Sequence, residues 1–234
     1  MPARFLEARW ENLCLFTYAV PPAVLQPYLP EGLELDTIGA DAFVSLVAFD
    51  FLDTSVFGVK WPGFVNFPEI NLRFYVRRGA EERGVVFIRE LVPQFFVAAM
   101  ARLTYNEPYL SCPMKSKIVR NDNRIEVEHN LKFSGKDYSI KLSADSSSFL
   151  PDETSTEHFF KEHKWGYGKS HTGRTIRYEV NHPFWDVHPV LSHSLELDFG
   201  VVYGSNFAFL NKAQLHSIIF ARGSEVAVFP NAVM

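Results

Sequence analysis

Hydrophobic and polar residues alternate most regularly in residues 67–77, Phe-Pro-Glu-Ile-Asn-Leu-Arg-Phe-Tyr-Val-Arg. With the period of two of a β-strand, one face carries four apolar side chains, those of Ile70, Leu72, Phe74 and Val76. The opposite face carries a polar row, made of Glu69, Asn71, Arg73, Tyr75 and Arg77. In an ordinary antiparallel sheet with one wet side, this row faces solvent. In a small barrel or a strongly curved sheet, the same row lines a cavity and can hold a small polar ligand.

Apolar and alternating runs on both sides of this segment predict further strands. We expect extended segments over residues 8–20, 43–51, 84–91, 176–180, 195–199 and 216–229. The last of these is expected to contain a turn at Arg222-Gly223-Ser224. Turn signals at 121–123 and 134–136 separate alternating runs and predict hairpins.

Three short helices are predicted between these strands. Pro21 and Pro22 suit the first turn of a helix that ends at residues 30–32, because proline has no N–H to leave unbonded there. Thr154 and Glu157 fit a capping box for a helix through about Lys164. Residues 93–105 have helical spacing of their apolar positions, with three side chains expected to face the core: Phe96, Val97 and Met100.

Composition favours a packed, soluble protein. The chain has 234 residues, 47% of them hydrophobic, with 22 Phe, and it contains no internal repeat. A net charge of −4 gives no general attraction to nucleic acid, and no apolar run is long enough to span a membrane. We therefore expect a cytoplasmic protein without nucleic-acid or membrane partners, and the sequence leaves open whether it forms a homo-oligomer. The predicted fold is a single α+β domain over residues 1–234, β-rich and built on a curved antiparallel sheet.

No standard catalytic motif occurs, and the remaining candidates have ordinary alternatives. His182, His188 and His193 surround Asp186, but their spacing matches no known ligand pattern, so we expect local packing, no metal and no cofactor. Cys14 and Cys112 lack the spacing of a zinc site or a disulfide framework.

Two further pairs of residues leave a functional and a bland interpretation open. Lys115 and Lys117 could form a Schiff-base pair, although a solvated strand face also explains them. Arg102 and Tyr105 lie about one turn apart on the predicted helix and could share a pocket, or the arginine could lie on the surface.

Several segments resemble the acetoacetate decarboxylase-like superfamily, and more closely its YqjF-like bacterial branch. The most specific is Pro68-Glu69-Ile70-Asn71-Leu72-Arg73-Phe74-Tyr75-Val76, which is similar to an E-x-N-x-R-x-Y-V pattern of that branch. Two further segments are similar to parts of the same branch. They are residues 18–33, which contain Val-Pro-Pro and Leu-Pro-Glu-Gly-Leu, and residues 101–109. The resemblance implies a curved sheet that closes around an internal cavity, with the polar row of residues 69–75 inside it.

The same resemblance argues against imine chemistry. Decarboxylases of the superfamily use a lysine activated by a second lysine in a Pro-Lys-Lys motif. Aligned on Arg89-Glu90-Leu91, the two lysine positions become Gln94 and Phe95; aligned on Pro113, they become Met114 and Lys115. Neither alignment leaves a lysine in the place of the nucleophile, so we expect no acetoacetate decarboxylation.

Three hypotheses remain for the function of the chain. It binds an apolar, carboxylate-bearing small molecule or keto acid; or it is an enzyme with Glu69 as general acid or base on a keto or hydroxy acid; or it is a structural protein without a site. For the first two, the predicted site consists of Glu69, Asn71, Arg73, Tyr75, Gln94, Arg102, Tyr105, Met114 and Lys115. Within it, Glu69 and Arg73 are expected to form an ion pair.

Overall fold

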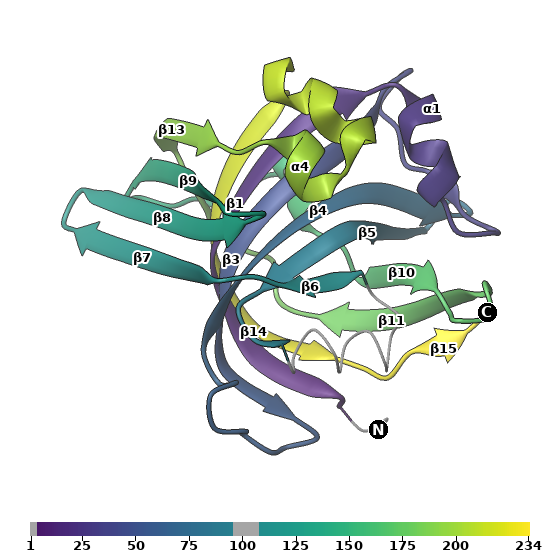
Figure 1. The fold of residues 1–234 in the computed structure, drawn as a ribbon, viewed down its shortest axis with the longest axis horizontal. Coiled ribbons are helices and arrows are strands. Elements are labelled where there is room, and N and C mark those ends of the chain that lie inside the picture. The colour runs from purple at the N-terminus through teal and green to yellow at the C-terminus, as the bar shows by residue number, and fades with distance from the viewer. Residues whose placement is uncertain (1–3, 96–107) are drawn as a thin grey trace.

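The computed structural model describes residues 4–95 and 108–234. Its main feature is a ring of strands, visible at the centre of Figure 1. In spatial order the ring runs through β14 (Ser217–Val228), β1 (Leu6–Val20), β3 (Ala42–Val56), β4 (Phe67–Arg78), β5 (Glu82–Val92), β10 (Trp165–Lys169) and β11 (Thr175–Asn181). Because β14 pairs with both β1 and β11, the sheet closes on itself. The predicted β-rich fold around a closing, curved sheet is therefore confirmed.

Most neighbouring strands in the ring are antiparallel. Two pairings are parallel, and both involve β5: one with β10 and one with the short β6 (Tyr109–Ser111). The ring is thus a mixed sheet rather than a purely antiparallel one. Short strands extend its edges: β2 (Glu34–Leu35), β12 (Val187–His188) and β15 (Ala232–Val233).

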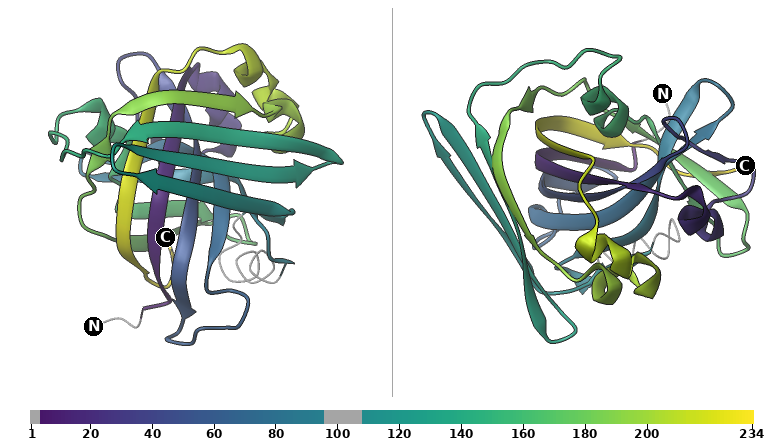
Figure 2. Two further views of the ribbon diagram at one scale, coloured as in Figure 1. Left: turned by 90° about the vertical axis from the view of Figure 1, so that its left-hand side faces the viewer. Right: turned by 90° about the horizontal axis from the view of Figure 1, so that it is seen from above.

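A second sheet packs across the outside of the ring, and its strands cross those of β1, β3 and β14 in Figure 2. It has the order β13 (Val190–Glu196), β9 (Lys136–Asp145), β8 (Arg124–Phe133) and β7 (Met114–Asn121). Alternate residues of β8, such as Ile125 and Val127, are buried between the two sheets, while the residues between them point outward. This alternation explains why the second sheet has one apolar side and one charged side.

Short helices close the ends of the molecule. They are α1 (Pro22–Leu25) with the 3-10 turn η1 (Gln26–Tyr28), α3 (Thr156–Lys161), and α4 (Phe199–Tyr203) with the 3-10 segment η2 (Ser205–Lys212). The predicted helix at 93–105, with Phe96, Val97 and Met100, lies outside the described residues except for its first positions. No helix in the described part of the chain is long and apolar enough to cross a membrane.

Two local predictions around the short helices are wrong. Ser155, not Thr154, caps α3 by accepting a hydrogen bond from the His158 N–H at 3.1 Å, because Thr154 is held in the preceding turn by Asp152. The strand predicted at 195–199 ends at Glu196, since the Asp198 carboxylate caps α4 by accepting from the Val201 N–H.

The predicted turn at Arg222-Gly223-Ser224 does not form, and β14 runs through it. Gly223 has a φ of +87°, and a Cβ there would lie 1.9 Å from the carbonyl oxygen of Trp10 on β1. The glycine therefore allows two strands to approach closely instead of reversing the chain.

Candidate functional site

Strand β4 has two buried faces. Its apolar face contributes Ile70, Leu72 and Phe74, each 0% exposed, to the layer under the second sheet. The opposite face points inside the ring, where Glu69 and Asn71 are each 2% exposed. From Glu69 to Tyr75 the polar row thus meets the interior of the barrel, whereas Arg77 at its end is exposed and pairs with Glu34.

Inside the ring lies a cavity of about 760 Å³, lined on one side by Glu69, Asn71 and Arg73. Most of its wall is apolar, formed by Leu13, Val47, Phe49, Phe51, Phe67, Val85, Phe87, Trp165, Val180 and Trp185. The loop after β3 contributes four more lining residues, Phe57, Val59, Trp61 and Phe64, of which Phe57 is 65% and Trp61 57% exposed. A cavity of this size with few polar groups is typical of a small-molecule site.

The acidic end of the cavity is built across three adjacent strands. Asn71 on β4 is the register partner of Glu90 on β5, and Glu90 is the partner of Tyr109 on β6. Glu69 accepts two hydrogen bonds, from Asn71 Nδ2 at 2.9 Å and from the Tyr109 hydroxyl at 3.0 Å. The two glutamates and the tyrosine all contribute to the cavity wall.

Burial sets the protonation of this end. It raises the pKa of Glu69 to about 7, against the opposing effects of the hydrogen bonds from Asn71 and Tyr109 and of the Arg73 charge. Burial, followed by the charges of Glu69 and Glu90, raises the pKa of Tyr109 well above its usual value. At neutral pH the tyrosine is therefore a hydrogen-bond donor, and Glu69 is divided between its acid and its carboxylate.

The basic end of the cavity is formed where the C-terminal end of α3 contacts the cavity wall. The Arg73 guanidinium donates to the carbonyl oxygen of Phe160 at 3.0 Å, at the C-terminal end of that helix. Lys161, whose side chain is 0% exposed, lines the cavity and is paired with Glu162. Cations are favoured at this position because the carbonyl ends of the helix carry partial negative charge.

His163 completes this end and is 8% exposed. Burial, with the nearby charges of Arg73 and Arg83, holds its pKa well below the usual value, so the ring is neutral at neutral pH. Among residues 4–95 and 108–234, neither ring nitrogen of His163 has a hydrogen-bond partner, and neither does Arg73 Nε. Buried polar atoms without partners are costly, so a bound molecule or water at this place would stabilise the protein.

The predicted ion pair between Glu69 and Arg73 does not form in the described chain. Four strand positions place their Cα atoms about 13 Å apart, which is too far for these two side chains to meet as each is held here. Arg73 contacts Phe160 and Glu69 contacts Asn71 and Tyr109 instead.

The other predicted site residues have different positions. Tyr75 is buried beside the cavity without lining it, and its hydroxyl bonds Ser45 Oγ at 2.5 Å and the Phe160 carbonyl at 3.3 Å. Gln94 donates to the Gly63 carbonyl at 3.2 Å, Met114 packs between the two sheets, and Lys115 points outward from β7. Arg102 and Tyr105 lie outside the described residues.

Among the cavity residues that sequence reasoning missed are four ionisable ones: Glu90, Tyr109, Lys161 and His163. The first two belong to strands whose register with β4 cannot be read from a single strand pattern. Lys161 and His163 come from a helix end far along the chain, with no local motif. Only the capping signal near residue 155 indicates that a helix ends close to them.

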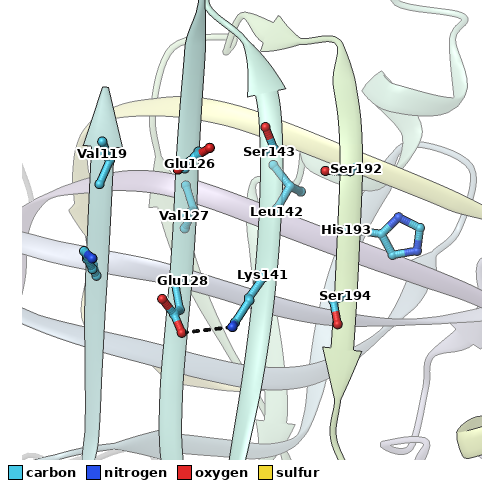
Figure 3. A pocket seen from close by; sticks show the side chains of 11 residues that line it. Val119, Glu126, Val127, Glu128, Lys141, Leu142, Ser143, Ser192, His193 and Ser194 are labelled. Atoms are coloured by element: carbon cyan, nitrogen blue, oxygen red, sulfur yellow. Dashed lines mark ion pairs between the residues drawn. The ribbon is translucent and has the colours of Figure 1, made fainter. Parts of the chain in front are cut away.

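A second hollow, of about 330 Å³, lies on the outer face of the second sheet (Figure 3). Most of its lining side chains are charged or hydroxyl-bearing, and the others are those of Val119, Val127, Leu142 and His193. Lys141 and Glu128 form an ion pair there at 3.4 Å. Exposed pairs of this kind contribute little and are the ordinary outer surface of a sheet. The lumen of the ring is therefore the candidate functional site.

The fold of the ring is shared with enzymes of known structure. Acetoacetate decarboxylase from Legionella pneumophila matches with a TM-score of 0.65 and 16% identity, over 100% of this chain and 87% of that one. The enduracididine biosynthesis enzyme MppR, in a complex with pyruvate, matches with a TM-score of 0.65 and 13% identity, over 100% and 91%. At these identities the likeness establishes an acetoacetate decarboxylase-like fold.

Residues 7–225 match the family model DUF2071, described as an uncharacterized conserved protein, and the chain belongs to that family. The uncharacterized protein YqjF of Bacillus subtilis is 28% identical over 109 residues, which cover 46% of this chain. The match covers 45% of YqjF, so less than half of that relative is aligned.

Proposed function

We propose that the cavity binds a small molecule with an apolar body and an acidic end, an apolar carboxylate or a keto acid. The observation that carries this proposal is the position of Arg73, whose Nε has no partner among the described residues, and of Lys161 on a mostly apolar wall. A carboxylate there accepts charge-assisted hydrogen bonds, and the Phe-rich wall excludes water from the tail. The pyruvate complex of MppR, which shares the fold, supports the keto-acid part of the proposal.

Calorimetric titration with octanoate and 2-oxooctanoate tests this proposal. Arg73→Met is expected to weaken binding of both by about 1.5–3 kcal/mol, the scale of a hydrogen bond to a charged group. Arg83→Met is the matched control, because Arg83 also bonds a carbonyl of α3, that of Phe159, but does not line the cavity. Equal weakening by both variants, or no binding by the unaltered protein, would overturn the proposal.

An enzyme with Glu69 as general acid or base is the second candidate. The observation that favours it is the pKa of Glu69, raised by burial to about 7, because a proton-transfer group works best near the operating pH. Turnover of a keto or hydroxy acid that is lost in Glu69→Gln, while the same acid still binds, would establish this role.

Imine formation is not part of the proposal, although Lys161 reaches the cavity. Its ammonium group is paired with Glu162, and an ammonium has no lone pair with which to attack the carbon of a ketone. We therefore expect no covalent adduct after borohydride treatment in the presence of acetoacetate or 2-oxooctanoate. A mass increase that disappears in Lys161→Met would show that this lysine is a nucleophile.

A further inference from the structure

The polar groups of the cavity are divided between two ends. Arg73 Cζ lies 5.9 Å from the centre of the Tyr75 ring, and its guanidinium reaches α3, so it is directed away from Glu69. Glu69 is tied to Asn71 and Tyr109 at the opposite end. The Cα atoms of Glu69 and Arg73 are about 13 Å apart along β4, with the apolar wall alongside. One small headgroup cannot satisfy both ends at once.

The free polar atoms at the two ends have opposite character. Arg73 Nε–H is a donor, and so is one nitrogen of the neutral His163 ring, which makes this end suited to an anion. At the other end the unbonded atom is Asn71 Oδ1, an acceptor on a side chain 2% exposed. The two donors beside it, Asn71 Nδ2 and the Tyr109 hydroxyl, are both used by Glu69. The unbonded Asn71 oxygen therefore calls for a donor from a ligand.

We propose that the ligand is bifunctional, with an acidic group held at Arg73 and a donor group, a hydroxyl or a protonated amine, held at Asn71 Oδ1. An apolar chain joins the two groups and lies along the Phe-rich wall. The inference rests on the proposed function, because it assumes that the acidic group binds at Arg73. It adds a second recognition point at Asn71, which lies two strand positions from Arg73, about 6.6 Å, on the same face of β4.

Calorimetry with octanoate, 8-hydroxyoctanoate and 8-aminooctanoate tests the second recognition point. At least one of the two bifunctional probes is expected to bind about tenfold more tightly than octanoate, the effect of one added hydrogen bond to a buried acceptor. Preference for the hydroxyl or the amine identifies which donor the site takes. In Asn71→Leu, the affinity of the preferred bifunctional probe should fall to about that of octanoate, a ratio of about one.

Octanoate serves as the internal control for folding, because it needs Arg73 but not Asn71. Should Asn71→Leu fail to bind octanoate, Asn71→Asp provides the second variant, since it keeps an acceptor at the same atom and should keep the ratio. Octanoate binding that depends on Arg73, with no gain from either terminal donor, would overturn the inference and leave the proposed function standing. A gain that persists in Asn71→Leu would also overturn it, and absence of octanoate binding would overturn both.

Discussion

Strand β4 presents Leu72 and Phe74 to the outside of the ring and Asn71 and Arg73 to its inside, and both sides are covered by other parts of the protein. The apolar side is closed by the second sheet, and its residues are packed without access to the cavity. The polar side keeps unbonded atoms next to a hollow of about 760 Å³. The comparison teaches that polar alternation in a strand marks a solvent face in an open sheet and a lined interior in a closed one.

The largest effect is expected from the apolar side. Phe74→Ala removes a ring that is 0% exposed, and the resulting cavity should lower the free energy of unfolding by about 3–5 kcal/mol. Chemical denaturation measures this loss. Octanoate affinity of the folded protein should be unchanged, and a parallel loss of affinity would mean that the two faces do not act separately.

The variant Glu69→Gln tests the polar side of β4 through the pH dependence of the free energy of unfolding. Because burial raises the pKa of Glu69 from 4.5 to about 7, the folded protein binds a proton more tightly than the unfolded chain. The stability that this provides is full below the unfolded pKa and is lost as pH rises to about 7, a loss on the order of 3 kcal/mol.

In Glu69→Gln this component of the pH dependence should be absent, so the variant gains stability relative to the unaltered protein as pH rises. Denaturation curves between about pH 5 and pH 8 measure the difference. If the free energy of unfolding changes with pH by the same slope in both proteins, the raised pKa of Glu69 is contradicted.

Tyr75→Phe should have the smallest effect, about 1 kcal/mol of stability, because it removes a hydroxyl bonded to Ser45 and Phe160. Tyr138→Phe is the matched control, since the Tyr138 hydroxyl has no hydrogen-bond partner in the described part of the chain and its removal should be nearly neutral. Thermal unfolding of both variants checks the difference. Equal effects would mean that the Tyr75 hydroxyl does not hold α3 in place.

The alternation of apolar and polar residues in 67–77 predicts strand β4 and which residues lie on each of its two faces. It could not show what covers each face, because a period of two is the same in an open and a closed sheet. The expected Glu69–Arg73 pair failed on strand geometry, since four positions separate the two residues too far. Lys161 reaches the same cavity only through tertiary packing of α3, which no local pattern near residue 161 encodes.

Mass spectrometry of the small molecules retained by the purified protein tests the central claim most directly. The unaltered protein, Arg73→Met and the control Arg83→Met are purified in parallel, denatured, and their released compounds compared. We predict an organic acid with an apolar body that is enriched in the unaltered protein and in Arg83→Met and depleted in Arg73→Met. The same compounds at the same level in all three proteins, or no bound acid in any of them, would contradict a ligand site on the polar face of β4.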